Sequence, residues 1–287
     1  MKMNNYLDSK AWREAFCFES YGEKIGFRFD EVKLKPKLLS ILPRISKVVD
    51  YQSCENVISL IVNENKETNG LYYNNEPAMM FEVFDDSVLE SIENKIIIIL
   101  AMASLPTKFY LHAGAIVFNN TGILIPGISY TGKTTLVEEF IKAGADYYTD
   151  DCIVLDNEGF FLPFPRPLAI RTKEGRIFRE ANYFGAKTGN KKKKVDLILF
   201  TSFEEHAVWQ PKKLSQGSGI LKLMDNFYYR GSVGNEPAEI IKTLTSLTKN
   251  ILMYGGERGE ASKVVGWFSD NFIQSTKNLN LTNHSYE

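Results

Sequence analysis

Residues 127–134 constrain the fold of this chain more than any other segment. They read Gly-Ile-Ser-Tyr-Thr-Gly-Lys-Thr, which satisfies the pattern G-x-x-x-x-G-K-[ST]. The apolar run GILIP precedes them, and the helix-like stretch 136–143 follows them and stops at Gly144. This context predicts a phosphate-binding loop between a strand and a helix, because the glycines let consecutive backbone N–H groups face phosphate oxygens at the positive end of the helix.

The residue types of this loop predict ATP and Mg²⁺ as its ligands. We expect Lys133 to bridge the terminal phosphates and the hydroxyl of Thr134 to hold Mg²⁺. A glycine-rich turn that only happens to contain a lysine is the alternative. The residues expected to bind the nucleotide are Gly127, Ser129, Thr131, Gly132, Lys133, Thr134, Thr135 and, farther along the chain, Arg171.

Two adjacent carboxylates, Asp150 and Asp151, stand between the β-type segments YYT and CIVLD. Each raises the other's cost of ionisation unless a cation lies nearby, and Mg²⁺ would neutralise both. Because neighbouring side chains of a strand point in different directions, we expect one carboxylate to hold the metal and the other to face an attacking hydroxyl. The alternative is a solvated acidic turn.

Net charge and cysteine content indicate which binding partners and which cellular compartment to expect. The 287 residues carry a formal net charge of -1, so no chain-wide attraction for nucleic acid or an anionic membrane is expected. Three cysteines without a close C-x-x-C pair suggest neither a disulfide framework nor a zinc site. The N-terminus lacks an apolar signal core, and the run 96–103 is far shorter than the roughly 20 residues of a membrane span. We therefore expect a cytoplasmic protein that acts on neither nucleic acid nor membrane.

The pattern of predicted secondary structure changes near Pro106. Residues 1–106 alternate short strand-like runs, VISLIVN from Val57 and MMFEVF from Met79, with polar turns, and end in a predicted helix over 87–105. They read as a small α+β domain without a catalytic pattern of its own, which we expect to recognise the acceptor. Residues 107–276 follow the order of an α/β nucleotide-binding core, and 277–287 read as a flexible tail.

Within the second domain, the elements can be predicted from turn signals and apolar runs. Asn119 and Asn120, followed by Thr-Gly, indicate a hairpin between AIVF and GILIP. VDLILF, from Val195, is typical of a buried strand. Helices are predicted over residues 220–229, 237–254 and 261–273.

Basic residues supply further candidates for phosphate contact, since a guanidinium suits bidentate binding. Arg166, Arg171 and Arg176 follow the acidic pair, and Arg171 is favoured because it follows the strand-like PLAI. Arg258, in a glycine-rich bend, is a second candidate. The lysine run 191–194 reads either as a solvated loop or as a loop that meets an acidic substrate.

Residues 111–156, with HAGAIVFNNTGILIPGISYTGKTTL and AGADYYTDDCIVLD, resemble the catalytic domain of bacterial HPr kinase/phosphorylase and its relatives. The resemblance continues more weakly to about residue 275. It implies a P-loop kinase core of the HPr kinase type, with a mixed β-sheet and flanking helices. It also implies that Lys133 and Thr134 bind nucleotide and Mg²⁺ and that an aspartate of the pair is the general base for a serine hydroxyl. His112, which spacing alone leaves between a structural and a catalytic role, would support the acidic pair.

The resemblance further favours Asp150 as the base and Asp151, with Thr134, as the metal anchor. It does not extend to residues 1–105, and the loop continues Lys-Thr-Thr where bifunctional members have Lys-Ser and an acidic residue. The glycine-rich motif associated with phosphorylase activity is absent too, and residues 165–171 stand in its place. The better match is to HPr kinase-like proteins, including those that phosphorylate lasso-peptide precursors.

The expected function is therefore ATP-dependent phosphoryl transfer to a serine-type hydroxyl of a small protein or peptide. A small hydroxyl metabolite as acceptor, a nucleotide-binding sensor, and an ATPase or carboxykinase-like enzyme stay open as alternatives, as does assembly into a homo-oligomer.

Overall fold

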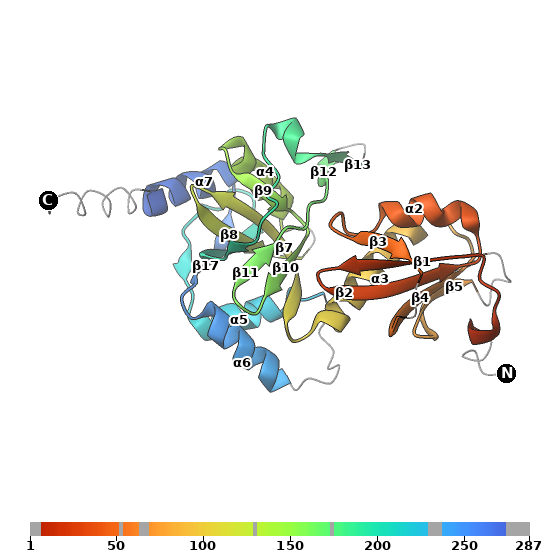
Figure 1. Cartoon of the computed structure of the whole chain (residues 1–287). Coiled ribbons are helices and arrows are strands. Elements are labelled where there is room, and N and C mark those ends of the chain that lie inside the picture. Colours follow the sequence, from red (N-terminus) through yellow and green to blue (C-terminus); the bar gives the residue numbers. More distant parts are fainter. Residues whose placement is uncertain are drawn as a thin grey trace, which may run out of the picture. The chain divides into compact units, whose positions relative to one another are not determined.

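The computed structural model describes residues 7–51, 54–62, 69–128, 131–172, 175–228 and 237–273. The chain divides into two compact units, Met1–Leu105 and Pro106–Glu287 (Figure 1). The predicted tail 277–287 lies outside the described residues. None of the helices in the described ranges is long and apolar enough to cross a membrane.

Unit 1 is a mixed sheet with helices, the α+β arrangement expected for this part of the chain. Its strands lie in the order β3-β1-β2-β4-β5-β6, and all neighbours are antiparallel except β2 and β4. The strands are β1 (Glu14–Ser20), β2 (Glu23–Phe29), β3 (Lys47–Asp50), β4 (Asn56–Ile61), β5 (Gly70–Tyr73) and β6 (Glu76–Met80). The helices are η1 (Val32–Leu34), α2 (Lys35–Ser40) and α3 (Asp86–Ser104).

Aromatic packing and a helix cap account for much of this unit. The rings of Phe16, Phe27 and Phe29 are buried against one another on β1 and β2. Asp85 caps α3, since its carboxylate accepts the backbone N–H of Val88 at 2.9 Å. The strand predicted from Met79 through residue 84 is wrong beyond Met80, because the chain leaves the sheet there to reach the cap.

Unit 2 contains a nine-stranded mixed sheet and a separate two-stranded one within the described residues. The main order is β14-β11-β10-β7-β8-β15-β17-β16, with β9 paired to β7, and β8, β15 and β17 run parallel. Figure 1 shows α4 and α7 on one side of this sheet and α5 and α6 on the other. The α/β class with flanking helices is therefore confirmed.

The strands of unit 2 are β7 (Lys108–Phe118), β8 (Thr121–Pro126), β9 (Asp146–Thr149), β10 (Cys152–Asp156), β11 (Phe160–Leu162), β12 (Leu168–Thr172), β13 (Gly175–Arg179), β14 (Lys193–Lys194), β15 (Leu197–Phe203), β16 (Lys212–Lys213) and β17 (Leu252–Arg258). The helices are α4 (Lys133–Lys142), η2 (Ala181–Phe184), α5 (Gln216–Met224), α6 (Pro237–Thr248), α7 (Ala261–Phe268) and the π-helical η3 (Ser269–Ile273).

The hairpin between β7 and β8 confirms the turn prediction. Asn119 and Asn120 occupy the turn with φ of 48° and 63°. Two successive positive φ values form the type I′ turn whose twist matches that of the flanking strands, and asparagine tolerates this conformation well. The turn thereby sets the register that carries β8 toward the phosphate loop.

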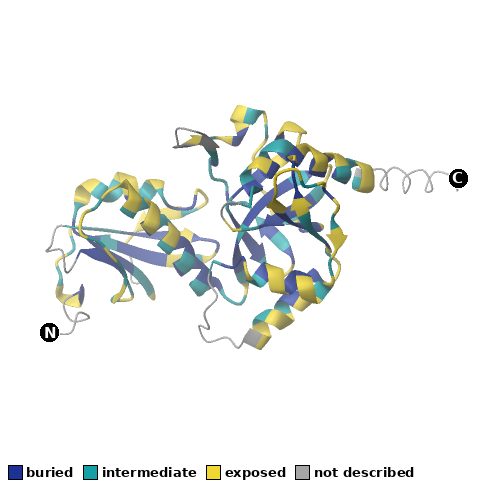
Figure 2. Cartoon of the chain, turned by 180° about the vertical axis from the view of Figure 1, so that it is seen from behind, coloured by how far each residue is buried: buried dark blue, intermediate teal, exposed yellow. Residues whose placement is uncertain are grey.

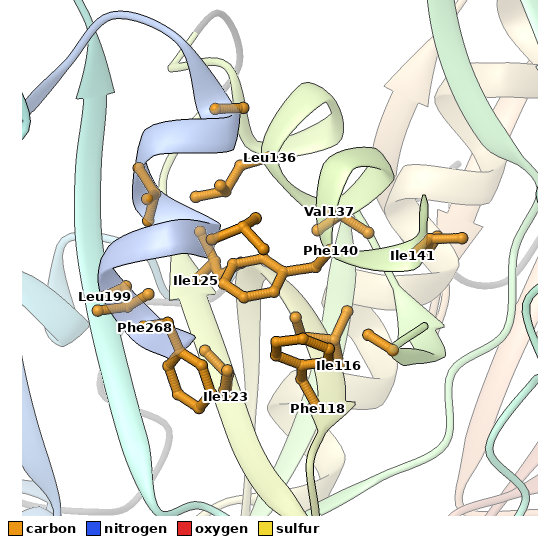
Figure 3. Packing of buried hydrophobic residues seen from close by; sticks show 14 of the residues in the cluster. Ile116, Phe118, Ile123, Ile125, Leu136, Val137, Phe140, Ile141, Leu199 and Phe268 are labelled. Carbon is orange, nitrogen blue, oxygen red and sulfur yellow. The ribbon is translucent and has the colours of Figure 1, made fainter. Parts of the chain in front are cut away.

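The helix that follows the phosphate loop packs on the sheet through a hydrophobic cluster (Figure 3). On α4, Val137 and Phe140 are fully buried against Ile116 and Ile123 of the β7–β8 hairpin. Phe268 of α7 meets the Phe140 ring edge-on, with centroids 6.0 Å apart. Each such side chain stabilises the fold by about 1.5–3 kcal/mol when fully buried, so the loop stands on a rigid base.

The other predicted helices need correction at their ends. The helix predicted over 220–229 begins earlier, because Ser215 accepts the N–H of Ser218 as its cap, and it ends at Met224. The helix predicted over 237–254 ends at Thr248, and the chain continues as the parallel strand β17. The helix predicted over 261–273 is α-helical to Phe268 and π-helical beyond it. Figure 2 shows the burial that underlies these elements, with buried strands between helices whose outer faces are exposed.

Candidate active site

The candidate active site lies where several strand ends of unit 2 meet. β8 and β15 are parallel, so their carboxyl ends share one edge of the sheet, the usual ligand-binding edge of α/β folds. The phosphate loop follows β8 at this edge. The chain also brings the acidic pair there, because Ala115 of β7 pairs with Thr149 of β9 and Ala113 pairs with Pro126 of β8.

The described part of the phosphate loop is closed by short polar contacts. Gly132 has φ of +80° and begins α4, where its carbonyl accepts the N–H of Leu136 at 3.1 Å. Thr131 Oγ1 and Lys133 Nζ donate to the carbonyl of Ile128 at 2.9 and 3.0 Å. The Lys133 residue is only 7% exposed, so its ammonium lies inside the loop and near any phosphate bound there.

The remaining loop residues differ in how the structure places them. Gly127 joins the loop to β7, since its N–H donates to the carbonyl of His112 at 3.0 Å. Thr135 is exposed on the first turn of α4. Ser129 lies outside the described residues, and so does the side chain of Arg171, whose backbone belongs to β12. The structure thus leaves these two expected nucleotide contacts as predictions.

Hydroxyl groups surround Asp150, which is 3% exposed. Thr134 Oγ1 donates to Asp150 Oδ2 at 2.8 Å, and the buried Tyr147 hydroxyl lies 3.0 Å from Oδ1. The same hydroxyl also lies 2.8 Å from the carbonyl of Arg166, so its one proton is shared between two acceptors. Burial raises the pKa of Asp150 above its usual value, and the negative charge of Asp151 raises it further. The hydrogen bonds from the Thr134 and Tyr147 hydroxyls act in the opposite direction but do not outweigh burial.

Asp151 lies instead among groups that carry or can carry positive charge. Arg166 Nη1 donates to Asp151 Oδ2 at 2.9 Å, and His112 Nδ1 lies 3.3 Å from Oδ1. The Tyr228 hydroxyl is 3.4 Å from Oδ2, and its ring stacks on the His112 ring with centroids 4.1 Å apart. Burial acts to raise the pKa of Asp151, but the His112 contact, the Arg166 charge and Lys133 outweigh it and lower the pKa to about 2.

The acidic pair is therefore split between two environments. The expected metal hydroxyl, Thr134, contacts Asp150 and not Asp151, whereas His112 contacts Asp151. This arrangement is the reverse of the one favoured from the resemblance, in which Asp151 and Thr134 formed the metal pair. Local strand pleating could not decide the matter, because the two carboxylates lie in the irregular link between β9 and β10.

The Thr134 and Asp150 oxygens fit a magnesium ion. Mg²⁺ takes oxygen ligands and is usually held by one or two protein groups together with phosphates and water. A buried carboxylate whose pKa is raised by desolvation is also a group whose ionised form a cation would stabilise. Among the described residues, no cluster of three or more His, Cys, Asp or Glu side chains is placed to hold a metal ion.

Arg258 is a further residue at this site, and its guanidinium is buried. Only 1% of the residue is exposed, and Nη2 donates to the carbonyl of Gly132 at 2.7 Å. Nη1 donates to the carbonyl of Gly259 at 2.9 Å, while Nε has no partner within the described residues. A Cβ on Gly132 would lie 2.6 Å from Nη2, so glycine is required at this point of the loop for close approach as well as for its φ.

The sequence predicts some of these site residues and not others. Arg166 is one of the three arginine candidates, but the sequence favours Arg171, which follows the strand-like PLAI. Tyr147 and Tyr228 were not predicted, since their contacts with the acidic pair depend on tertiary packing. In the lysine run, Lys192 contacts Glu158 at 3.0 Å, and Lys193 and Lys194 form β14, so this part of the run is an edge strand with a surface ion pair.

Comparison with known proteins finds structural likeness but no match of sequence. No protein-family model matches the chain, and no curated protein matches it. Among solved structures, the chain is similar to the Hpr(Ser) kinase/phosphatase from Coxiella burnetii, at 14% sequence identity and a TM-score of 0.33. The likeness covers 62% of this chain and 98% of that one.

Proposed function

We propose that this protein is an ATP-dependent kinase that transfers the terminal phosphoryl group to a hydroxyl, in the first instance a serine hydroxyl of a peptide or small protein. The observation that carries the proposal is the split acidic pair beside the phosphate loop. Asp150 shares a contact with Thr134, and Asp151 shares contacts with His112 and Arg166. The choice of serine rests on the resemblance of residues 111–156 to the HPr kinase type.

The phosphate loop and Asp150 form the nucleotide side of the proposed reaction. Lys133 supplies a buried positive charge for the terminal phosphates, and Arg258 supports the loop through the carbonyl of Gly132. Thr134 and Asp150 would hold Mg²⁺, which when bound supplies neutralisation of the phosphate charge. Such positioning and charge neutralisation make up most of what phosphoryl transfer needs from a protein.

Asp151 forms the acceptor side. Its lowered pKa keeps it ionised throughout the neutral range, so it always offers an acceptor to the substrate hydroxyl. A carboxylate of low pKa is a weak base, but phosphoryl transfer through a loose transition state requires little proton abstraction before the phosphorus–oxygen bond breaks. His112 orients this carboxylate, and Arg166 fixes its other oxygen. We therefore assign Asp151 as the base and Asp150 as the metal anchor.

The decisive experiment is to incubate the pure protein with γ-labelled ATP and Mg²⁺ and to offer free serine, serine-bearing peptides and the protein HPr as acceptors. Label on a serine hydroxyl, lost in Lys133→Ala, is the expected result. Label that appears only as free phosphate would favour an ATPase, and nucleotide binding without turnover would favour a sensor. Label on a small hydroxyl compound alone would keep the kinase and change its substrate class.

A further inference from the structure

Two cysteines that are far apart in the sequence meet in unit 1. Cys17 lies in the middle of β1, and Cys54 lies two residues before the start of β4. Their Sγ atoms are 3.1 Å apart, although 37 positions separate the two residues in the chain. Both are thiols in this structure. Because the sequence contains no close C-x-x-C pair, the fold alone brings these two thiols together.

The arrangement of the strands explains how the two thiols meet. In the sheet, β2 lies between β1 and β4, and its Gly26 is the partner of Cys17 on one side and of Val57 on the other. Glycine has no side chain to cover its own place on the sheet. Cys54 packs there instead, since a Cβ on Gly26 would lie 3.5 Å from Cβ and 3.6 Å from Sγ of Cys54. Cys54 therefore reaches across β2 to the thiol on β1.

The two thiols differ in exposure, and this difference sets the order in which they can react. Cys17 is fully buried, whereas Cys54 is partly exposed. Burial and the hydrogen bond with Cys17 raise the pKa of Cys54 to about 11, and the positive charge of Lys24 opposes this without outweighing it. A thiol reacts through its thiolate, so a small reagent should react slowly at neutral pH and should meet Cys54 first.

We propose that Cys17 and Cys54 form a reversible intramolecular disulfide, which makes this pair a redox modification site of unit 1. The oxidant is a small-molecule disulfide. The Cys54 thiolate attacks one of its sulfur atoms, so a mixed disulfide forms and one small thiol leaves with the proton that Cys54 lost. Cys17 then attacks Cys54 Sγ, and its proton passes to the second small thiol as this departs. Two protein thiols and one small disulfide thus become one protein disulfide and two small thiols.

The geometry requires only a small movement for this bond. A disulfide joins its sulfur atoms at about 2.0 Å, so the two Sγ atoms must approach by roughly 1 Å. The bond closes a ring that contains β2, η1, α2 and β3. Such a ring restricts the unfolded chain, so the oxidised protein should unfold at a higher temperature. Small thiols reverse the reaction, so in a reducing compartment the bond would form only while disulfides accumulate.

Mass spectrometry of the full-length protein can follow the reaction. The reduced protein is incubated with oxidised glutathione at about pH 8.5, where the thiolate fraction is larger. It is then unfolded, and the remaining thiols are alkylated with N-ethylmaleimide. We expect only Cys152 to be alkylated, and we expect digestion to release a linked peptide that contains Cys17 and Cys54. Dithiothreitol should make all three cysteines available again. Oxidation should raise the melting temperature of unit 1 by at least about 5 °C.

Variants of the cysteines separate the two steps. Cys17→Ala should stop at the mixed disulfide and gain the mass of one glutathionyl group. Cys54→Ser, a change at a partly exposed position, removes the first thiol to react and should leave both remaining cysteines open to alkylation. Neither variant should melt at a higher temperature after oxidation. Cys152→Ala is the matched control, because it removes a buried cysteine of unit 2 and should still give the linked peptide.

A wild type whose three cysteines are all alkylated after oxidation would overturn the proposal. The same follows if the wild type accumulates the mixed disulfide to the same extent as Cys17→Ala. A linked peptide that contains Cys152, or a bond between two copies of the chain in place of one within it, would also overturn it. No residue of the proposed kinase site takes part in the reaction, so these outcomes leave the proposed function as it stands.

Discussion

Asp150 and Asp151 are neighbours in the chain, yet they belong to two different regions of the site. Asp150 is deeply buried and contacts hydroxyl groups from α4 and β9, whereas the Asp151 side chain is 40% exposed and lies among cationic and aromatic groups. Burial raises the pKa of Asp150, while the contacts with His112 and Arg166 lower the pKa of Asp151 to about 2. The two aspartates are the same residue type, so the groups that contact them from distant elements give them their different environments.

The largest expected effect is on turnover after removal of the acceptor-side carboxylate. Asp151→Asn should lower the rate of phosphoryl transfer by at least about a hundredfold, because an amide cannot accept the hydroxyl proton. Its affinity for ATP·Mg should stay within a few fold of wild type. Single-turnover transfer and equilibrium binding, measured on the same preparation, separate these quantities.

Asp146→Asn is the matched control, since Asp146 is an exposed carboxylate at the other end of β9. It should transfer at the wild-type rate. An Asp151→Asn protein that transfers at the wild-type rate would remove the acceptor-side role from this residue.

The next effect concerns the metal requirement on the nucleotide side. Thr134→Val removes the hydroxyl that contacts Asp150 and should raise the Mg²⁺ concentration for half-maximal ATP binding about tenfold. Thr245→Val changes an exposed threonine of α6, whose hydroxyl donates to the carbonyl of Ile241, and should leave this concentration unchanged. Equal Mg²⁺ titrations for the two variants would argue against Thr134 as a metal ligand.

A smaller loss of turnover is expected at His112. His112→Gln should slow transfer by about tenfold while ATP·Mg affinity is retained, because the side chain orients Asp151 without being the base itself. Transfer rates of His112→Gln, Asp151→Asn and the double variant test this dependence. If the effects of the two single changes simply multiply, His112 acts independently of Asp151 and the orienting role is wrong.

The smallest effects are on stability, and they have opposite signs. The pKa of Asp151 is lower in the folded protein than the value of about 3.9 in the unfolded chain. Its ionised form therefore stabilises the fold at pH values above about 3.9, and this contribution is lost as the pH falls toward 2. The raised pKa of Asp150 means that its ionised form costs stability at neutral pH. Without Mg²⁺ at pH 7, Asp150→Asn should therefore melt at or slightly above the wild-type temperature.

Asp151→Asn should melt below wild type at pH 7 and should converge on it near pH 2. Thermal unfolding followed by circular dichroism across this range measures both variants. An Asp150→Asn protein that melts well below wild type at pH 7 would show that the hydroxyl contacts outweigh burial at this carboxylate.

The local parts of this structure could be predicted from sequence, but the assignments within the site could not. The Asn119–Asn120 turn, the strand before the phosphate loop and the helix after it depend on short-range backbone preferences. The partners of Asp151 come from β7 and from the segment between β11 and β12, and no periodicity reports on such pairings. The first residues of β17, 252–254, fall within the helix predicted over 237–254, since a short apolar run has no distinctive period.

Unit 1 illustrates a different limit. Its α+β character could be predicted from alternating runs and turns, but it carries no motif, so its expected role in acceptor recognition stays a prediction. A protein lacking residues 1–105 that still transfers phosphate to the natural acceptor at the wild-type rate would contradict that role.

The roles of the two carboxylates can be separated by the Mg²⁺ dependence of ATP binding in Asp150→Asn and Asp151→Asn, measured side by side with wild type. If Asp150 is the anchor, its variant should bind ATP with an affinity that Mg²⁺ hardly changes, while Asp151→Asn keeps the wild-type Mg²⁺ response. The opposite pattern, in which Asp151→Asn loses the response and Asp150→Asn keeps it, would contradict the assignment of the two carboxylates.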